Sequence, residues 1–118
     1  MNEVIKLKNR DLYLCRNLKR AESFVERGIG LMFKDEMYEG YDGLLLKPCN
    51  SIHTFFMRFS IDVMFLDRKL RVVKIIKNMQ PWRISGFYFK SAQVLEMNSQ
   101  TIPEGIIIGD QLEILCIN

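Results

Sequence analysis

Short apolar segments alternate with polar turns along most of this chain, and their pattern favours β-strands. Residues 61–66 and 70–77 are rich in β-branched and aromatic side chains and flank a tight link at 67–69, which is typical of a β-hairpin. The same signals predict strands at residues 3–7, 11–15, 43–47, 52–58, 93–97 and 111–117, and an aromatic loop or irregular strand at 81–89. Most of the chain is therefore expected to be extended.

One segment departs from this pattern from residue 17 onward. Its apolar residues recur at spacings of three and four, which predicts a helix with one apolar face; they are Leu18, Ala21, Phe24 and Val25. Gly28 and Gly30 are expected to end this helix. A capping-box pattern at residues 101–104 predicts a single helical turn closed by Gly105.

Together these elements predict a mainly β domain of the α+β class. We expect a compact barrel-like or sandwich sheet, with one helix in the N-terminal half and a short helical turn near residue 103. No internal repeat or Pro/Gly/Ser-rich linker divides the 118 residues, so a single domain spanning 1–118 is expected. A chain of this length buries about two-thirds of its surface on folding, which suffices for one core without disulfides or metal.

Composition narrows the functional classes. The residues are 48% hydrophobic and 26% charged, as in ordinary globular proteins. The net charge of +3 is small, and Lys and Arg are scattered rather than set in a basic stripe, so nucleic acid is not the expected partner. The three cysteines Cys15, Cys49 and Cys116 are widely spaced, which suits a reducing compartment. No apolar stretch approaches about 18 residues, so we expect no membrane span and a cytoplasmic location.

Six motif-bearing segments follow one another in a fixed order, at residues 27–34, 43–46, 53–58, 61–67, 94–96 and 109–112. This ordered set resembles the domain of unknown function 192 family, over roughly residues 20–115. The resemblance implies a compact, largely β fold and no established activity. Leu70 and Gln100 stand where the resemblance implies glycine, and Phe59 and Ser60 replace a polar pair, so the loops at these positions are expected to differ.

His53 is the only histidine, and two interpretations of it stay open. It is either a proton shuttle in a pocket, because its pKa lies near neutrality, or a histidine hydrogen-bonded at the edge of the core. No acid or nucleophile lies at a fixed spacing nearby, which favours the second. In an extended strand Cys49, His53 and Met57 would lie roughly 13 Å apart in succession. One metal ion cannot bridge that distance, so neither a metal site nor a cofactor is predicted.

Asp62 shares a strand face with Met64 and Leu66, an unusual place for a carboxylate, because an unpaired buried charge is costly. The expected hairpin places Lys74 opposite or diagonal to Asp62, and Arg58 is a second candidate partner. We therefore expect Asp62 to be ion-paired and mainly structural rather than catalytic.

Two groups of side chains suggest binding surfaces. Arg27 and Lys34 flank a Gly-Leu-Met segment and either hold an anion or serve as favourable charges at a helix C-terminus and in a solvated loop. Aromatic and basic residues cluster in 82–89, which is typical of stacking or protein-binding surfaces but also of the closed end of a core. Trp82 and Arg83 are expected to be exposed.

The leading hypothesis is a binding module without catalytic activity, whose partner is an unidentified small ligand or a protein. The candidate binding residues are His53, Thr54, Arg58, Asp62 and Trp82, with Arg27 and Lys34 at the rim. The alternative is a small hydrolase or isomerase in which His53 works with Asp62 or Glu96 as the orienting acid.

Overall fold

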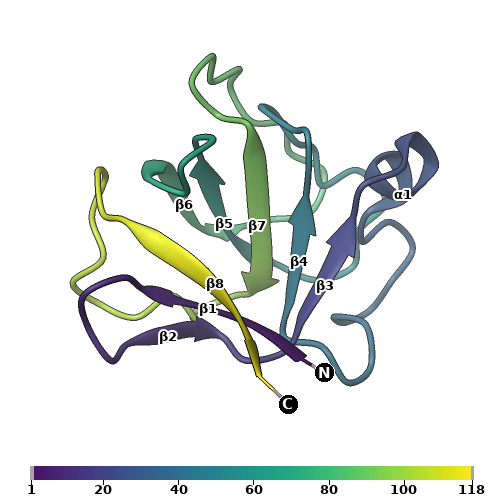
Figure 1. Ribbon diagram of the computed structural model, residues 1–118. Helices are drawn as coiled ribbons and strands as arrows, with labels where there is room; N and C mark the ends of the chain where they lie inside the picture. The colour runs from purple at the N-terminus through teal and green to yellow at the C-terminus, as the bar shows by residue number, and fades with distance from the viewer. Residues whose placement is uncertain (1, 118) are drawn as a thin grey trace.

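The computed structural model describes residues 2–117 and consists of two β-sheets and one helix (Figure 1). The elements are β1 (Asn2–Leu7), β2 (Tyr13–Cys15), β3 (Leu18–Ala21), α1 (Phe24–Ile29), β4 (Gly43–Leu46), β5 (Ile61–Leu66), β6 (Val72–Met79), β7 (Gln93–Asn98) and β8 (Leu112–Ile117). Three strands form one sheet in the order β2-β1-β8, and five form the other in the order β3-β4-β7-β5-β6. The mainly β, α+β fold class is confirmed, and the sheets are not closed into a barrel.

The central strand of the larger sheet is β7, which lies between β4 and β5. Both of these neighbours run antiparallel to β7, whereas β3 pairs with β4 in parallel. In this register Glu96 of β7 lies opposite Leu44 on one side and opposite Val63 on the other. An acidic side chain therefore occupies the middle of the sheet.

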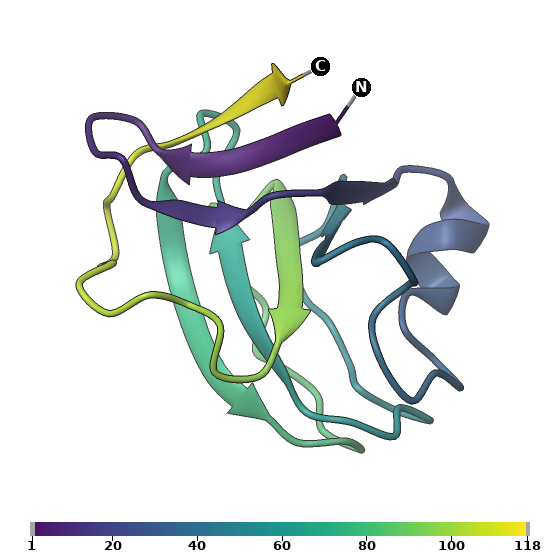
Figure 2. The ribbon, with the colours of Figure 1, turned by 90° about the horizontal axis from the view of Figure 1, so that it is seen from below.

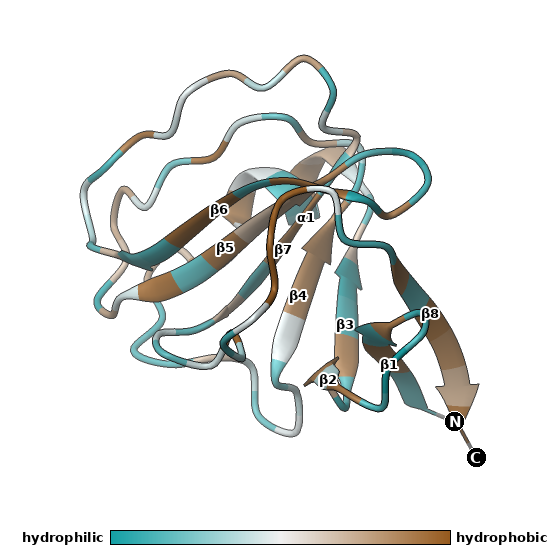
Figure 3. Ribbon diagram, turned by 90° about the vertical axis from the view of Figure 1, so that its left-hand side faces the viewer, coloured by the Kyte–Doolittle hydropathy of each residue, from teal (hydrophilic) through white to brown (hydrophobic). Residues whose placement is uncertain are grey.

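The five-stranded sheet is covered on both faces. Figure 2 shows the three-stranded sheet lying across one face. The buried side chains of that interface include Ile5, Leu14, Leu45, Met64, Leu95, Met97 and Leu112. The opposite face is covered by irregular loops, whose buried partners include Leu31, Met37, Leu44, Ile52, Met57, Phe65 and Val94. All six residues of β5 are consequently buried, and Figure 3 shows β4 and β5 as largely apolar strands.

The helix begins later than its apolar spacing predicts. Residues 18–21 form β3, because parallel pairing with β4 satisfies their backbone groups. The helix α1 begins after Ser23, whose hydroxyl accepts the Glu26 N–H at 3.0 Å while the Glu26 carboxylate accepts the Ser23 N–H at 3.1 Å. Gly30, with φ of 49°, caps its end.

Across residues 2–117 no helix has the length and apolar character needed to cross a membrane.

Residues 52–58 do not form the predicted strand. His53 makes a single β-bridge to Ile84, after which the chain turns, with the Met57 N–H donating to the Thr54 carbonyl at 3.2 Å. Phe56 adopts a left-handed φ of 63° within this turn. The alternation of faces expected for this segment is therefore wrong. The other predicted strands match the structure to within two residues at each end.

The segment expected to form a helical turn near residue 103 forms turns without helix. The Thr101 hydroxyl donates to the Asn98 carbonyl at 2.5 Å rather than accepting a helical N–H. The backbone N–H groups of Thr101 and Ile102 donate to the Asp62 carboxylate instead. The capping pattern is thus overridden by contacts with a distant strand.

Leu70 and Gln100, which replace expected glycines, both adopt left-handed backbone conformations, with φ of 64° and 68°. Both turns keep a backbone conformation that favours glycine, so at these two positions the loops do not differ in φ as the replaced glycines suggested. A residue with a Cβ is strained there by roughly 1 kcal/mol or more.

Gln100→Gly is expected to raise the free energy of unfolding by about 1 kcal/mol, because glycine adopts positive φ without a steric cost. Gln100 is exposed, so little packing is lost. Urea denaturation measures the change. The matched control is Gln80→Gly, at an exposed position outside the left-handed region, where a small destabilisation is expected. Equal effects at both positions would contradict the strain argument.

Candidate functional site

A small cavity of about 70 Å³ lies on the loop-covered face of the five-stranded sheet. One wall comes from residues 28–32, at the end of α1 and just beyond it. A second wall comes from the loop after β4, through residues between 49 and 53. Glu96 of β7 and Met57 border the cavity as well. Three segments that are distant in sequence therefore meet around one enclosed space.

Glu96 supplies a carboxyl group to this cavity from the central strand. It shares a strand face with the apolar Val94 and is only 3% exposed. Burial raises the pKa of its carboxyl to about 8. At neutral pH the group is therefore mostly protonated. A protonated carboxyl offers one O–H donor together with acceptor oxygens.

Cys49 and His53 share the cavity with Glu96 but do not form a nucleophile–base pair. The Cys49 thiol donates to the Ser51 carbonyl at 3.1 Å, and burial raises the pKa of this thiol, which keeps it protonated. His53 accepts the Phe55 N–H on its Nδ1 at 3.2 Å. Among residues 2–117, no three His, Cys, Asp or Glu side chains are arranged to hold a metal ion.

The loop also overturns a distance argument made from the sequence. Cys49, His53 and Met57 would be far apart along an extended strand, yet all three border this one cavity. The turn at residues 54–57 brings Met57 back towards the segment that carries Cys49 and His53.

Exposed aromatic side chains continue from the cavity onto the surface, and we call Phe33, Phe55, Phe56 and Trp82 the aromatic cluster. The ring centroids of Phe56 lie 5.2 Å from Phe33 and 4.7 Å from Trp82, and Phe55 stacks on His53 at the edge of the cavity. The Phe33, Phe56 and Trp82 side chains are 60%, 44% and 55% exposed.

Backbone strain is concentrated in the same cluster. Phe33, Phe56 and Trp82 all have left-handed φ, at 64°, 63° and 64°. Such conformations cost of the order of 1–3 kcal/mol each for bulky residues and gather at functional sites.

Thr54 positions this cluster rather than lining the cavity. It is fully buried, its N–H donates to the Arg83 carbonyl at 2.8 Å, and its hydroxyl donates to the Gln80 carbonyl at 2.6 Å. Its own carbonyl accepts the Trp82 N–H at 2.9 Å. Thr54 thus joins the loop after β4 to the loop after β6.

Of the three cations among the candidate binding residues, Arg27 and Lys34 at the rim and Arg58 in the lining, the structure brings only Arg27 to the cavity. Its guanidinium donates to the Pro48 carbonyl at 3.0 Å. The Lys34 ammonium lies 3.9 Å from the centroid of the Tyr38 ring instead. Arg58 forms an exposed ion pair of 3.2 Å with an aspartate of the loop after α1.

Asp62 does not border the cavity, and its expected ion pair is wrong. The buried carboxylate accepts three backbone N–H groups, from Asn78 at 2.8 Å, Thr101 at 3.1 Å and Ile102 at 3.2 Å. Register shifts between β5 and β6 move Lys74 away from the position expected for a partner. These contacts tie three segments together and support a structural role.

Sequence reasoning undervalued Glu96, which it considered only as an orienting acid for His53. The signal was present in the strand at residues 93–97. Val94 and Glu96 are two residues apart and so share one face, and Leu95 and Met97 make the other face apolar as well. A carboxyl in a strand with two apolar faces predicts a buried acid, as it did for Asp62.

Comparison with known proteins finds a matching family model and relatives that are UPF0127 proteins. The DUF192 family model, described as "Uncharacterized ACR", matches residues 5–114. A UPF0127 protein of Pyrococcus horikoshii is 48% identical over 66 residues, which span 54% of this chain and 56% of that protein. A UPF0127 protein of Pyrococcus furiosus is 34% identical over 99 residues, which span 79% of this chain and 82% of that protein.

A solved structure shares the fold. It is the crystal structure of a protein of unknown function from Novosphingobium aromaticivorans, which is 21% identical and superposes with a TM-score of 0.76. The superposition covers 93% of this chain and 83% of that one. At this identity the likeness concerns the architecture alone.

Proposed function

The chain belongs to the DUF192 family, whose description assigns no activity, and from its cavity we propose that it is a ligand-binding module. The ligand places a polar end group against Glu96 and an apolar body against the aromatic cluster. The observation that carries this proposal is the Glu96 carboxyl, which lines the cavity, is only 3% exposed and has its pKa raised to about 8 by burial. Such a group is costly to bury, and strongly shifted carboxyls in clefts are typical of functional sites.

The size of the cavity defines the ligand further. A volume of about 70 Å³ admits only a small group, so the rest of the ligand must lie outside. There it meets the aromatic cluster, whose exposed rings favour an apolar or aromatic body. A protonated Glu96 can donate to a carbonyl or transfer its proton to a basic nitrogen. An amine or amide attached to an apolar body therefore fits best.

Three observations favour binding over the enzymatic alternative. The Nδ1 of His53 is engaged by a backbone N–H, the Cys49 thiol is protonated, and the Asp62 carboxylate is bound by backbone amides away from the cavity. General acid–base catalysis requires a base that is free to reach the proton it transfers. The cytoplasmic location expected from the sequence also fits, because Cys15, Cys49 and Cys116 are all free thiols.

Benzylamine and benzamide test this proposal, since each joins an aromatic ring to a small polar group. We expect millimolar benzylamine to shift the ¹³C resonance of the Glu96 carboxyl and the indole N–H of Trp82 in NMR spectra. Ionisation of Glu96 beside the ammonium stabilises the complex, so Glu96→Gln should weaken benzylamine binding about tenfold and affect benzamide less.

The matched control for the aromatic cluster is Phe87→Ala, which removes an exposed aromatic ring outside it. Trp82→Ala should weaken both probes, whereas Phe87→Ala should weaken neither. If neither probe shifts Glu96 and Trp82 together at millimolar concentration, the proposed site is wrong.

A further inference from the structure

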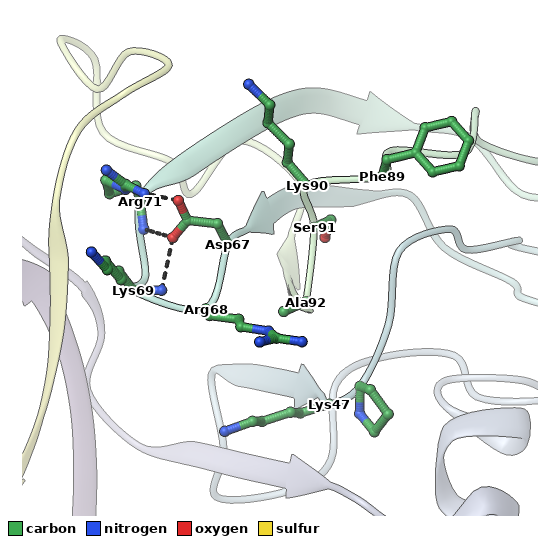
Figure 4. A pocket seen from close by; sticks show the side chains of 10 residues that line it. Lys47, Asp67, Arg68, Lys69, Arg71, Phe89, Lys90, Ser91 and Ala92 are labelled. Carbon is green, nitrogen blue, oxygen red and sulfur yellow. Dashed lines mark hydrogen bonds and ion pairs between the residues drawn. The ribbon is translucent and has the colours of Figure 1, made fainter.

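A second and larger hollow, of about 970 Å³, lies at the end of the five-stranded sheet where β4 and β5 end and β7 begins (Figure 4). Three segments line it, and we call it the basic groove. They are residues 47–48 after β4, residues 67–71 of the β5–β6 turn except Leu70, and residues 89–92 before β7. Glu96 and the aromatic cluster do not line this groove.

Positive charge is concentrated in the basic groove. Five cationic side chains line it, namely Lys47, Arg68, Lys69, Arg71 and Lys90, against the single carboxylate of Asp67. Five positive charges less one negative charge leave +4, whereas the whole chain carries only +3. The rest of the molecule is therefore close to neutral. The cations that look scattered in the sequence are gathered by the fold at one end of the sheet.

The one carboxylate does not neutralise the remaining cations. Asp67 accepts the backbone N–H groups of Lys69 at 2.8 Å and Arg71 at 2.9 Å, and its other oxygen accepts the Arg71 Nε–H at 2.8 Å. Burial alone would raise the pKa of Asp67, but these hydrogen bonds hold it below its usual value. Lys47, Arg68 and Lys90 have no ion-pair partner among residues 2–117.

Hydrogen bonds between the lining segments fix the frame of the groove. The Ser91 hydroxyl donates to the Cys49 carbonyl at 3.1 Å, and the Ala92 N–H donates to the Leu66 carbonyl at 2.8 Å. The Gln93 amide donates to the carbonyl of the residue that begins the β5–β6 turn, at 3.1 Å. The backbone of the three segments that carry the cations is therefore fixed before any ligand binds.

The groove also offers apolar surface. Figure 4 shows the Arg68 side chain extending between Lys47 and the segment that carries Ala92. Pro48 and Phe89 lie along the same hollow, and Phe89 is almost fully exposed. An exposed aromatic ring beside unpaired cations can stack on a planar group while the cations hold an anion.

We propose that the basic groove binds a small organic ligand that carries at least two phosphate groups. A planar guanidinium matches phosphate oxygens in a bidentate manner, and lysine ammonium groups add charge around it. The volume is in the range of small-molecule sites, and several unpaired cations call for more than one anionic group. This site is independent of the Glu96 cavity and takes a ligand of different chemistry.

Inorganic pyrophosphate and orthophosphate are the probes, titrated by calorimetry at low salt against the full chain. Pyrophosphate is expected to bind at one site and at least about tenfold more tightly than orthophosphate, because two phosphates engage more of the cations. Arg68→Ala should weaken pyrophosphate about tenfold without lowering the melting temperature, since Arg68 is exposed in a turn.

Arg10→Ala is the matched control, because Arg10 is an exposed arginine in a turn outside the groove. It should leave pyrophosphate affinity unchanged, as should Glu96→Gln, so that a failure at one site is distinguishable from a failure at the other. Equal losses with Arg68→Ala and Arg10→Ala, or the absence of saturable binding, would overturn the proposal. A single-stranded oligonucleotide that binds more tightly than pyrophosphate, with a steep salt dependence, would also overturn it and assign the groove to nucleic acid.

Discussion

Glu96→Gln is expected to abolish most of the pH dependence of stability between about pH 5 and pH 8. An unfolded glutamate releases its proton near the usual pKa of 4.5, whereas folded Glu96 releases it near 8. Between these values the folded state binds one more proton than the unfolded state, so the free energy of unfolding falls as pH rises. At about 1.4 kcal/mol per pH unit, the total loss is of the order of 4 kcal/mol.

Urea denaturation at several pH values across this interval measures the effect. The parent protein should be most stable near pH 5 and lose stability steadily towards pH 8, while the Glu96→Gln variant should change little. The control is Glu104→Gln, which removes an exposed carboxyl and should keep the slope of the parent protein. A Glu96→Gln variant with the same slope as the parent would show that Glu96 ionises normally.

Other shifted groups act outside this interval. The carboxyls of Glu3 and Asp67 have lowered pKa values, so their contribution to stability is lost only as pH falls into the acid range. The thiols of Cys15 and Cys49 have raised pKa values, so they affect stability only in alkaline solution. The slope between pH 5 and pH 8 can therefore be assigned to Glu96.

Asp62→Asn is expected to lower the free energy of unfolding by about 2–4 kcal/mol. The carboxylate accepts three backbone N–H groups in a buried position. An asparagine side chain has one acceptor oxygen, and its own N–H₂ group would face donors, so at least one amide loses its partner. Leaving a buried donor unsatisfied costs about 1–3 kcal/mol, and the loss of charge weakens the remaining bonds.

Urea denaturation at pH 7 measures this loss, and the benzylamine titration shows whether the Glu96 cavity survives. Asp35→Asn is the control, because Asp35 takes part only in an exposed ion pair and should change stability by less than about 0.5 kcal/mol. If Asp62→Asn is as mild as Asp35→Asn, Asp62 does not hold the three segments together.

Sequence patterns predicted the strands well where pairing and burial agree with local preference. The strands at 61–66 and 93–98 have β-rich sequences and lie inside the sheet, and the strand at 72–79 pairs with the first of them at the edge. The segment 18–21 was predicted to be helical, but it is a strand. Its two buried residues, Leu18 and Ala21, are three positions apart, and this spacing is compatible with both a helix and a short strand. Its partner β4 lies more than twenty residues away, and no local signal reveals that pairing.

The candidate site was harder to predict for a related reason. Residues 52–58 have the composition of a strand, but Thr54 bonds to residues 80–83 and forces a turn. The cavity is lined by segments from three parts of the chain, so spacing along the chain could not place His53 and Glu96 on the same cavity. Arg27 and His53, two of the candidate binding residues, line this cavity, and their part in binding stays a prediction.

The two faces of the larger sheet are covered by different kinds of structure. One face is closed by a second sheet, and its packing can be kept constant while the loops on the other face change. Substitutions in residues 28–33 or 49–57 alter the cavity walls and the aromatic surface without touching the inter-sheet interface. The exposed positions of these loops are therefore the natural place to engineer the proposed binding site, because buried residues of the same loops, such as Leu31, Ile52 and Met57, belong to the core.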